Sequence, residues 1–172
     1  MNDTLKKYIK VSLTLGLIAG GSALLIGLTN SITATKIIQN DATKEANGLK
    51  SVFSDDSQTF DTIDVSADTY EYISKIWSVK SNSKDLGFVY KTSGKNSFGE
   101  VSLLLGFDTN KTFVNMVVLT NTETYGSTLE ENYIDPVNSS TREFTDVSCG
   151  ATYGAKLVRD MYLEAKADVE KR

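Results

Sequence analysis

Val11–Leu28 reads VSLTLGLIAGGSALLIGL, and no charged residue occurs between Lys10 and Lys36. An apolar run of about 18–20 residues is long enough to cross the hydrocarbon core of a membrane as a helix. Lys6, Lys7 and Lys10 precede the run, and the positive-inside rule then places the N-terminus in the cytoplasm. We therefore predict three regions: a cytoplasmic N-terminus at residues 1–10, a transmembrane helix at residues 11–30 and an extracytoplasmic domain at residues 31–172.

A cleaved signal peptide is the alternative reading of the apolar run. Its apolar region usually spans only about 7–15 residues, which is shorter than the run seen here. No cysteine lies directly after the run to serve as a site for lipid attachment. Gly16, Gly20 and Gly21 offer a face of small residues to a neighbouring helix. The sequence thus favours a single-pass protein of the cell membrane, with the lipid bilayer as a partner.

The composition excludes several classes of function. The chain contains no histidine, which removes the usual general base near neutral pH and imidazole as a metal ligand. Its one cysteine, Cys149, cannot by itself hold a zinc ion or an iron–sulfur cluster, so we predict no metal site. The net charge is −4, and the domain after the apolar run has no basic stripe, which argues against nucleic acid as a partner. Redox chemistry in this protein would need an organic cofactor.

The rest of the chain has a mixed pattern. Residues 36–53 place Ile38, Ala42, Leu49 and Phe53 near helical spacing, and Ser54–Gln58 break this helix. Apolar and polar residues alternate through the middle, where Ser93-Gly94 and Asp108–Lys111 supply turns. The final segment, from Leu157 to Val169, has helical spacing again. Strands between terminal helices predict an α+β domain with a central antiparallel sheet flanked by helices. The predicted strands are residues 69–80, 87–91, 98–107 and 112–119. The last two are predicted to pair as a hairpin.

A loop of small residues leads into the final helix, and it reads Asp146-Val147-Ser148-Cys149-Gly150-Ala151-Thr152. A helix N-terminus exposes free backbone N–H groups and the positive end of the helix dipole, an arrangement that suits a phosphate. Gly150 and Ala151 permit close approach of a ligand to the backbone, and Thr152 offers a hydroxyl. The alternative is a plain capped helix whose small residues pack on the sheet. Cys149 has two readings as well, a redox thiol or a small residue filling a small space.

This loop resembles the flavinylation motif of the FMN-binding domain shared by two proteins, the G subunit of the Rnf electron-transport complex and the C subunit of the Na⁺-translocating NADH:quinone reductase. The motif reads Asp, two variable residues, Ser or Thr, then Gly-Ala-Thr. Asp146, Gly150, Ala151 and Thr152 match it, whereas Cys149 replaces the Ser or Thr. The resemblance implies that FMN is joined through a phosphoester to the Thr152 oxygen. A separate Mg²⁺-dependent flavin transferase would install it from FAD.

A second segment, Glu123-Thr124-Tyr125-Gly126, resembles the family's Glu-Thr-Pro-Gly-Leu-Gly loop, which approaches the flavin ring. Tyr125 stands in place of the proline, and Ser127 and Thr128 in place of Leu-Gly. The resemblance implies that Glu123, Thr124 and Gly126 join the cofactor-binding set with Cys149, Gly150, Ala151 and Thr152. Trp77, Tyr70 and Tyr72 are aromatic residues that could stack on a flavin, although core packing is the simpler role for them.

The resemblance implies an electron-carrier subunit of a membrane-bound, ion-translocating oxidoreductase, nearer to the short Rnf G subunit than to the longer reductase C subunit. Such a flavoprotein would work beside other membrane subunits and would have no catalytic residue of its own, because the flavin carries the chemistry. One alternative is a free-standing anchored flavoprotein that passes electrons to external acceptors. Another is an anchored binding module without flavin.

Overall fold

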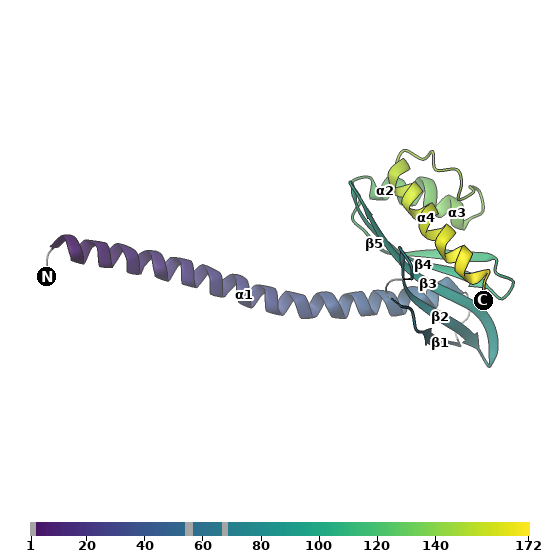
Figure 1. The fold of residues 1–172 in the computed structure, drawn as a ribbon, viewed down its shortest axis with the longest axis horizontal. Coiled ribbons are helices and arrows are strands. Elements are labelled where there is room, and N and C mark those ends of the chain that lie inside the picture. Colours follow the sequence, from purple (N-terminus) through teal and green to yellow (C-terminus); the bar gives the residue numbers. More distant parts are fainter. Residues whose placement is uncertain (1–2, 54–56, 67–68) are drawn as a thin grey trace. The chain divides into compact units, whose positions relative to one another are not determined.

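The computed structural model describes residues 3–53, 57–66 and 69–172, without the side chain of Thr35. The chain divides into two units, Met1–Thr43 and Lys44–Arg172. One helix, α1 (Asp3–Val52), forms the whole described part of the first unit and continues into the second (Figure 1). The helix expected at residues 36–53 is thus the continuation of the apolar helix, without a break between them.

In the first unit, α1 has the properties of a membrane-spanning helix. Its most apolar 18 residues have a mean hydropathy of 2.0, and none of that window is buried within the protein. Thr14 and Thr29 donate their hydroxyls to the carbonyls of Lys10 and Leu25, one turn earlier. Such bonds satisfy polar side chains where no water is available. Among the described residues, α1 is the one helix long and apolar enough to cross a membrane, which supports single-pass anchoring.

The second unit is built on a five-stranded antiparallel sheet in which neighbours in sequence are neighbours in space. The α+β class and the central antiparallel sheet are therefore confirmed. Gln58, expected to lie in a break, instead opens the first strand, and residues 54–56 of that expected break lie outside the described part. The strands are β1 (Gln58–Ile63), β2 (Ile73–Ser81), β3 (Lys84–Asn96), β4 (Gly99–Asp108) and β5 (Phe113–Asn121).

The β4–β5 hairpin forms as predicted, and Asp108 closes its turn. One Asp108 carboxylate oxygen accepts hydrogen bonds from the backbone N–H groups of Asn110 and Thr112, at 2.9 and 2.8 Å. The turn expected at Ser93-Gly94 was wrong, because both residues lie inside β3, paired with Ser102 and Val101. Gly94 forms no turn but allows α4 to pack closely on β3. A Cβ on Gly94 would lie 2.8 Å from side-chain atoms of both Leu157 and Met161.

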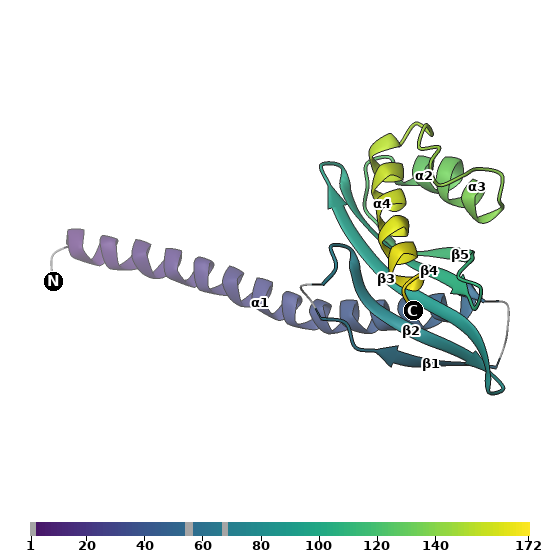
Figure 2. The ribbon, with the colours of Figure 1, turned by 45° about the vertical axis from the view of Figure 1, so that its right-hand side comes forward.

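Helices pack on both faces of the sheet, and a hydrophobic core lies between the sheet and the helices on each face. The C-terminal helix α4 (Thr152–Val169) crosses β3 and β4 on one face, with α2 (Gly126–Leu129) beside its first turn (Figure 2). The end of α1 packs on the other face. Because β4 has a cover on each side, it is buried continuously from Val101 to Phe107. The core beneath α4 includes Ile76, Tyr90, Leu103, Leu105, Ala155, Val158 and Met161, and the core beneath α1 consists of Leu49, Val52, Phe53, Trp77, Val79, Val89 and Leu104.

The end of α1 approaches the sheet closely because two glycines meet it. A Cβ on Gly48 would lie 2.9 Å from the Leu104 side chain, and a Cβ on Gly106 would overlap Val52. Glu45 adds an ionic contact, since its carboxylate pairs with the ammonium groups of both Lys75 and Lys91. Burial alone would raise the pKa of Glu45, but these two pairs outweigh it and hold the pKa below its usual value.

The last turn of α4 is fixed by a buried carboxylate, Asp168. It accepts hydrogen bonds from the hydroxyls of Tyr70 and Tyr90, at 2.5 and 2.9 Å, and from the guanidinium of Arg172 at 2.6 Å. Burial by itself would raise the pKa of Asp168, but these three donors outweigh it, so the pKa lies below its ordinary value. The carboxylate therefore ties α4 to β3 and to the segment that precedes β2.

We predict that Asp168→Asn lowers the free energy of unfolding by about 1.5–3 kcal/mol near neutral pH, the range for hydrogen bonds to a charged group. A depressed pKa contributes stability that is complete above the unfolded-state value and is lost as the pH falls through the folded-state value. The difference between wild type and variant should thus shrink below about pH 4. Denaturant unfolding of the detergent-solubilised chain at neutral and acid pH measures it. An equal difference at both pH values would contradict this role.

Candidate functional site

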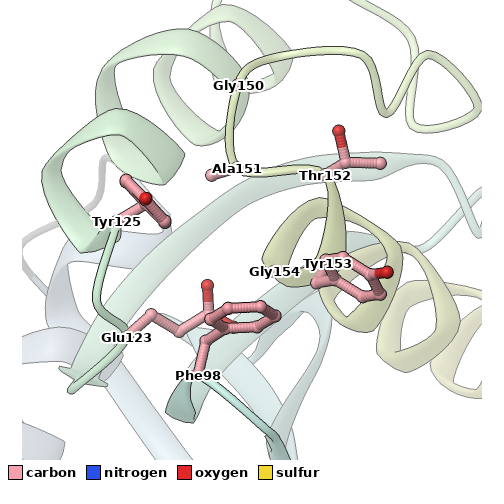
Figure 3. A pocket seen from close by; sticks show the side chains of 8 residues that line it. All are labelled: Phe98, Glu123, Tyr125, Gly150, Ala151, Thr152, Tyr153 and Gly154. Carbon is pink, nitrogen blue, oxygen red and sulfur yellow. The ribbon is translucent and has the colours of Figure 1, made fainter.

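A cavity of about 350 Å³ lies where three segments meet at the first turn of α4 (Figure 3). The turn between β3 and β4 supplies one lining residue, the connection from β5 to α2 supplies two, and the end of the loop that enters α4 and the first turn of α4 supply the rest. Its volume falls in the range of about 300–1,000 Å³ that is common for small-molecule sites. The lining residues are Phe98, Glu123, Tyr125, Gly150, Ala151, Thr152, Tyr153 and Gly154.

The backbone at the entrance to α4 leaves donors available. Gly150 has a φ of +87°, a left-handed conformation that L side chains rarely adopt, and this turn directs the chain into the helix. Ala151 is the N-cap residue and has no side chain able to cap, so no side-chain hydrogen bond closes this helix end. Thr152 is the first helical residue. Its hydroxyl makes no hydrogen bond with any residue that the structure describes, and its side chain lies at the cavity.

A buried carboxylate, Glu123, stands at the floor of the cavity. It is 9% exposed, and the amide of Asn96 donates a hydrogen bond to one of its oxygens. The other oxygen lies against Gly154, so closely that a Cβ on Gly154 would overlap it. A negative charge near a helix N-terminus is stabilised by the free N–H groups and the helix dipole. Only glycine at position 154 leaves room for this arrangement.

Three aromatic side chains surround the cavity while staying accessible to solvent. Phe98, Tyr125 and Tyr153 are 38%, 55% and 64% exposed, respectively. The rings of Phe98 and Tyr153 are 5.2 Å apart between centroids and tilted by 36°. The ammonium group of Lys156 lies 5.9 Å from the Tyr153 ring centre, within reach of a cation–π contact. Figure 3 shows Phe98 and Tyr153 next to each other on one side of the site and Tyr125 on the side of α2.

The structure brings the two sequence motifs together. Glu123, from the Glu-Thr-Tyr-Gly segment, and Gly150, Ala151 and Thr152, from the loop before α4, all line the same cavity, although Glu123 and Gly150 lie 27 positions apart in the sequence. From the sequence, only the resemblance to a family predicts that these two segments lie side by side. Their juxtaposition depends on α2, which carries the chain from the end of β5 back toward α4.

Four residues predicted for the site, Thr124, Gly126, Asp146 and Cys149, do not line the cavity. The Thr124 hydroxyl donates to the backbone carbonyl of Phe98 at 3.3 Å, and Gly126 contacts the side chain of Asn121. Cys149 is buried, and its side chain belongs to the core beneath α4. Asp146 pairs with Arg142 at 3.1 Å and keeps a largely exposed carboxylate.

Sequence reasoning missed the aromatic residues of the site. Phe98 is predicted to begin a strand but lies in the β3–β4 turn, and Tyr125 stands where the resembled motif has a proline. The available signal was the placement of large aromatic residues in short polar connections, where no core requires them. The aromatic residues suggested as flavin contacts lie elsewhere: Trp77 is buried beneath α1, and Tyr70 and Tyr72 pack against the core beneath α4.

Comparison with known proteins finds one related family model. Residues 1–52 match the model described as the RnfG N-terminal region. The chain thus resembles the RnfG subunit over the membrane helix and its continuation to the sheet. This match is independent of the two site motifs, which lie well beyond residue 52. No curated protein matches the chain.

We predict that Gly150→Ala destabilises the fold by about 1–2 kcal/mol, the cost of placing an L side chain in the left-handed region. Gly150→Asn should cost less, because asparagine adopts this conformation more readily. A new Cβ would otherwise meet only the Thr128 methyl group at 3.3 Å, so backbone conformation dominates the effect. Denaturant unfolding of both variants checks this, and an asparagine variant less stable than the alanine variant would contradict it.

Proposed function

We propose that the protein is an electron-carrier subunit of an Rnf-like, membrane-bound, ion-translocating oxidoreductase, and that it carries FMN joined covalently to Thr152. The observation that supports this most is the Thr152 hydroxyl, which lies without a hydrogen-bond partner among the described residues at an uncapped helix N-terminus within an aromatic-walled cavity. The RnfG-type match of residues 1–52 supports it separately.

The first turn of α4 suits the phosphate of FMN. The backbone N–H groups of Thr152, Tyr153 and Gly154 begin the helix and have no intrahelical acceptor. Such groups, with the positive end of the helix dipole, favour a phosphate. In flavinylation the Thr152 oxygen would form a bond to the FMN phosphorus of FAD while the phosphoanhydride bond breaks. AMP leaves, and the hydroxyl proton passes to the transferase or to water.

The walls of the cavity suit the flavin ring. Phe98, Tyr125 and Tyr153 offer aromatic faces to a flat ring system, and aromatic pairs prefer offset or tilted contacts. Glu123 would supply the polar group that orients the ring and influences its potential through its charge. Thr124 and Gly126 would act by shaping the connection around Glu123, and Cys149 by filling the core behind Gly150. The exposed Asp146 carboxylate would be available to the flavin transferase.

Covalent FMN would supply one- and two-electron chemistry, and the protein would hold it and set its distance from other carriers. A covalent link prevents loss of the cofactor by dilution outside the cell. The helix of residues 11–30 would keep the domain, residues 31–172, at high effective concentration near the other membrane subunits of the complex. The partners proposed are therefore those subunits and, during maturation, the flavin transferase.

The attachment site is tested by Thr152→Val, which keeps the shape of the side chain and removes its oxygen. Co-expressed with a flavin transferase, the variant should fold but carry no covalent flavin, seen as the loss of in-gel fluorescence after denaturation. Thr128→Val is the matched control, because Thr128 lies in α2 next to Gly150, and this variant should leave labelling intact. Persistent fluorescence of Thr152→Val would place the link elsewhere.

The orientation is tested by protease added to intact spheroplasts. Lys6, Lys7 and Lys10 favour a cytoplasmic N-terminus, so the domain should be digested from outside. Replacing all three lysines with glutamine should weaken this preference and protect a fraction of the molecules. A domain that is fully protected in wild-type spheroplasts would show the opposite orientation.

A further inference from the structure

A helix with an unusual central turn links the two parts of the site. Three short elements follow one another without a break: α2 (Gly126–Leu129), the π-helix η1 (Glu130–Ile134) and α3 (Asp135–Asn138). The junction residues Leu129 and Asp135 have ordinary right-handed helical angles, so the three form one helix with a π turn inside it. π turns are rare and occur frequently at functional sites.

Two consecutive residues of the π turn bind the loop that precedes Thr152. The amide of Asn132 donates to the carbonyl of Cys149 at 3.2 Å, and the hydroxyl of Tyr133 donates to the carbonyl of Phe144 at 2.7 Å. Tyr133 is fully buried, and this burial raises the pKa of its phenol, which keeps the hydroxyl protonated as a donor. Within the described residues, these two bonds and those from Arg142 are the hydrogen bonds that reach residues 143–151 from elsewhere in the chain, apart from the start of α4.

The bond to Cys149 controls the backbone next to the acceptor. A peptide unit is planar, so holding the Cys149 carbonyl fixes the plane that also contains the Gly150 nitrogen. Gly150 then turns with its positive φ and leads through Ala151 into Thr152. The bond to Phe144 holds the other end of the loop, where the Phe144 ring stacks on Tyr162 of α4 at 3.6 Å between centroids. The loop is thereby fixed at both ends.

The contacts inside the loop complete its shape. The guanidinium of Arg142 donates to the carbonyls of Asp146 and Ser148, at 3.0 and 3.3 Å, and pairs with the Asp146 carboxylate. Arg142 is itself tied to α3, because its backbone N–H donates to the carbonyl of Pro136 at 3.1 Å. Its side chain therefore holds the middle of the loop, at Asp146 and Ser148, and does not reach Cys149. Attachment near Gly150 depends on the π turn, because Asn132 is the residue that reaches Cys149.

We propose that Asn132 and Tyr133 are positioning residues for the attachment of FMN to Thr152, and that the π turn exists to present them side by side to the loop. This inference rests on the proposed function. By holding the Cys149 and Phe144 carbonyls, the two residues orient the Thr152 hydroxyl before the transferase and FAD arrive. Because the loop is already ordered, the entropy cost of ordering it is not added to the barrier of the attachment reaction.

The test measures the rate of FMN incorporation into the full-length, detergent-solubilised chain by a flavin transferase with FAD and Mg²⁺. Tyr133→Phe and Asn132→Leu each remove one donor at nearly constant volume. Each should slow incorporation roughly threefold to tenfold, the range expected for losing one hydrogen bond between neutral groups. Asn132→Gln, which keeps the amide, should recover part of the rate. Hydrogen exchange at the Gly150 and Thr152 amides should be faster in both slow variants.

Tyr90→Phe and Asn138→Leu are the matched controls. The first removes a buried tyrosine hydroxyl that binds Asp168 at the opposite end of α4, where Tyr70 and Arg172 still hold the carboxylate. The second removes an amide that the same composite helix directs to Met116 of β5, away from the loop. Both should lower stability and leave the incorporation rate unchanged.

Each remaining outcome is decisive. If Tyr133→Phe and Asn132→Leu are labelled at the wild-type rate, while Thr152→Val is not labelled, the positioning role is wrong and the flavin site stands. If Tyr90→Phe slows labelling as much as Tyr133→Phe, general stability explains the effect and the positioning role is also wrong. If the wild-type chain accepts no FMN, the proposed function itself fails.

Discussion

The placement of α4 across β3 and β4 is the constraint on which the site depends. Asp168 fixes the last turn of this helix to two tyrosine hydroxyls, and Gly94 lets its middle approach β3 closely. With its C-terminal end and middle fixed, a helix of regular pitch has little freedom at its N-terminus. Thr152 therefore lies beside the β3–β4 turn and Glu123 because of contacts made far along the same helix. The position of the site is therefore determined by the packing of α4 more than by the local sequence around Thr152.

The opposite face of the sheet is covered by the end of α1. The end of α1 fills it through Leu49, Val52 and Phe53, and Gly106 accommodates Val52. The continuation of an apolar helix thus becomes part of a domain core, without a linker between Lys44 and Val52. Because both faces of β4 are covered, the strand has no exposed apolar surface, and the accessible aromatic residues of the domain gather instead around the cavity.

Sequence reasoning succeeded where one local signal dominated. The Asp108–Lys111 turn, the helical spacing after Thr152 and the apolar run before Leu28 each indicate one structure from nearby residues alone. It failed where long-range packing decided the outcome. Ser93-Gly94 has the composition of a turn, yet α4 requires a glycine inside β3 at that point. The helix from Gly126 to Asn138 has no clear apolar period, because its π turn interrupts the helical spacing. The aromatic lining of the cavity could not be predicted from the sequence either, because three segments far apart in the chain supply it.

At two of the positions that differ from the motifs that these loops resemble, the side chain and the backbone have separate roles. Cys149 stands where a hydroxyl residue is usual, yet its side chain is buried in the core, while its carbonyl accepts the bond from Asn132. A small, weakly polar side chain suits that core position as well as a hydroxyl residue would. Tyr125 replaces a proline, but its backbone forms the N-cap of α2 and its ring lines the cavity. At both positions the backbone holds the loop in shape, so the side chain is free to vary with its surroundings. Gly150 and Gly154 have less freedom, because a Cβ would be strained at the positive φ of Gly150 and would overlap the Glu123 carboxylate at Gly154.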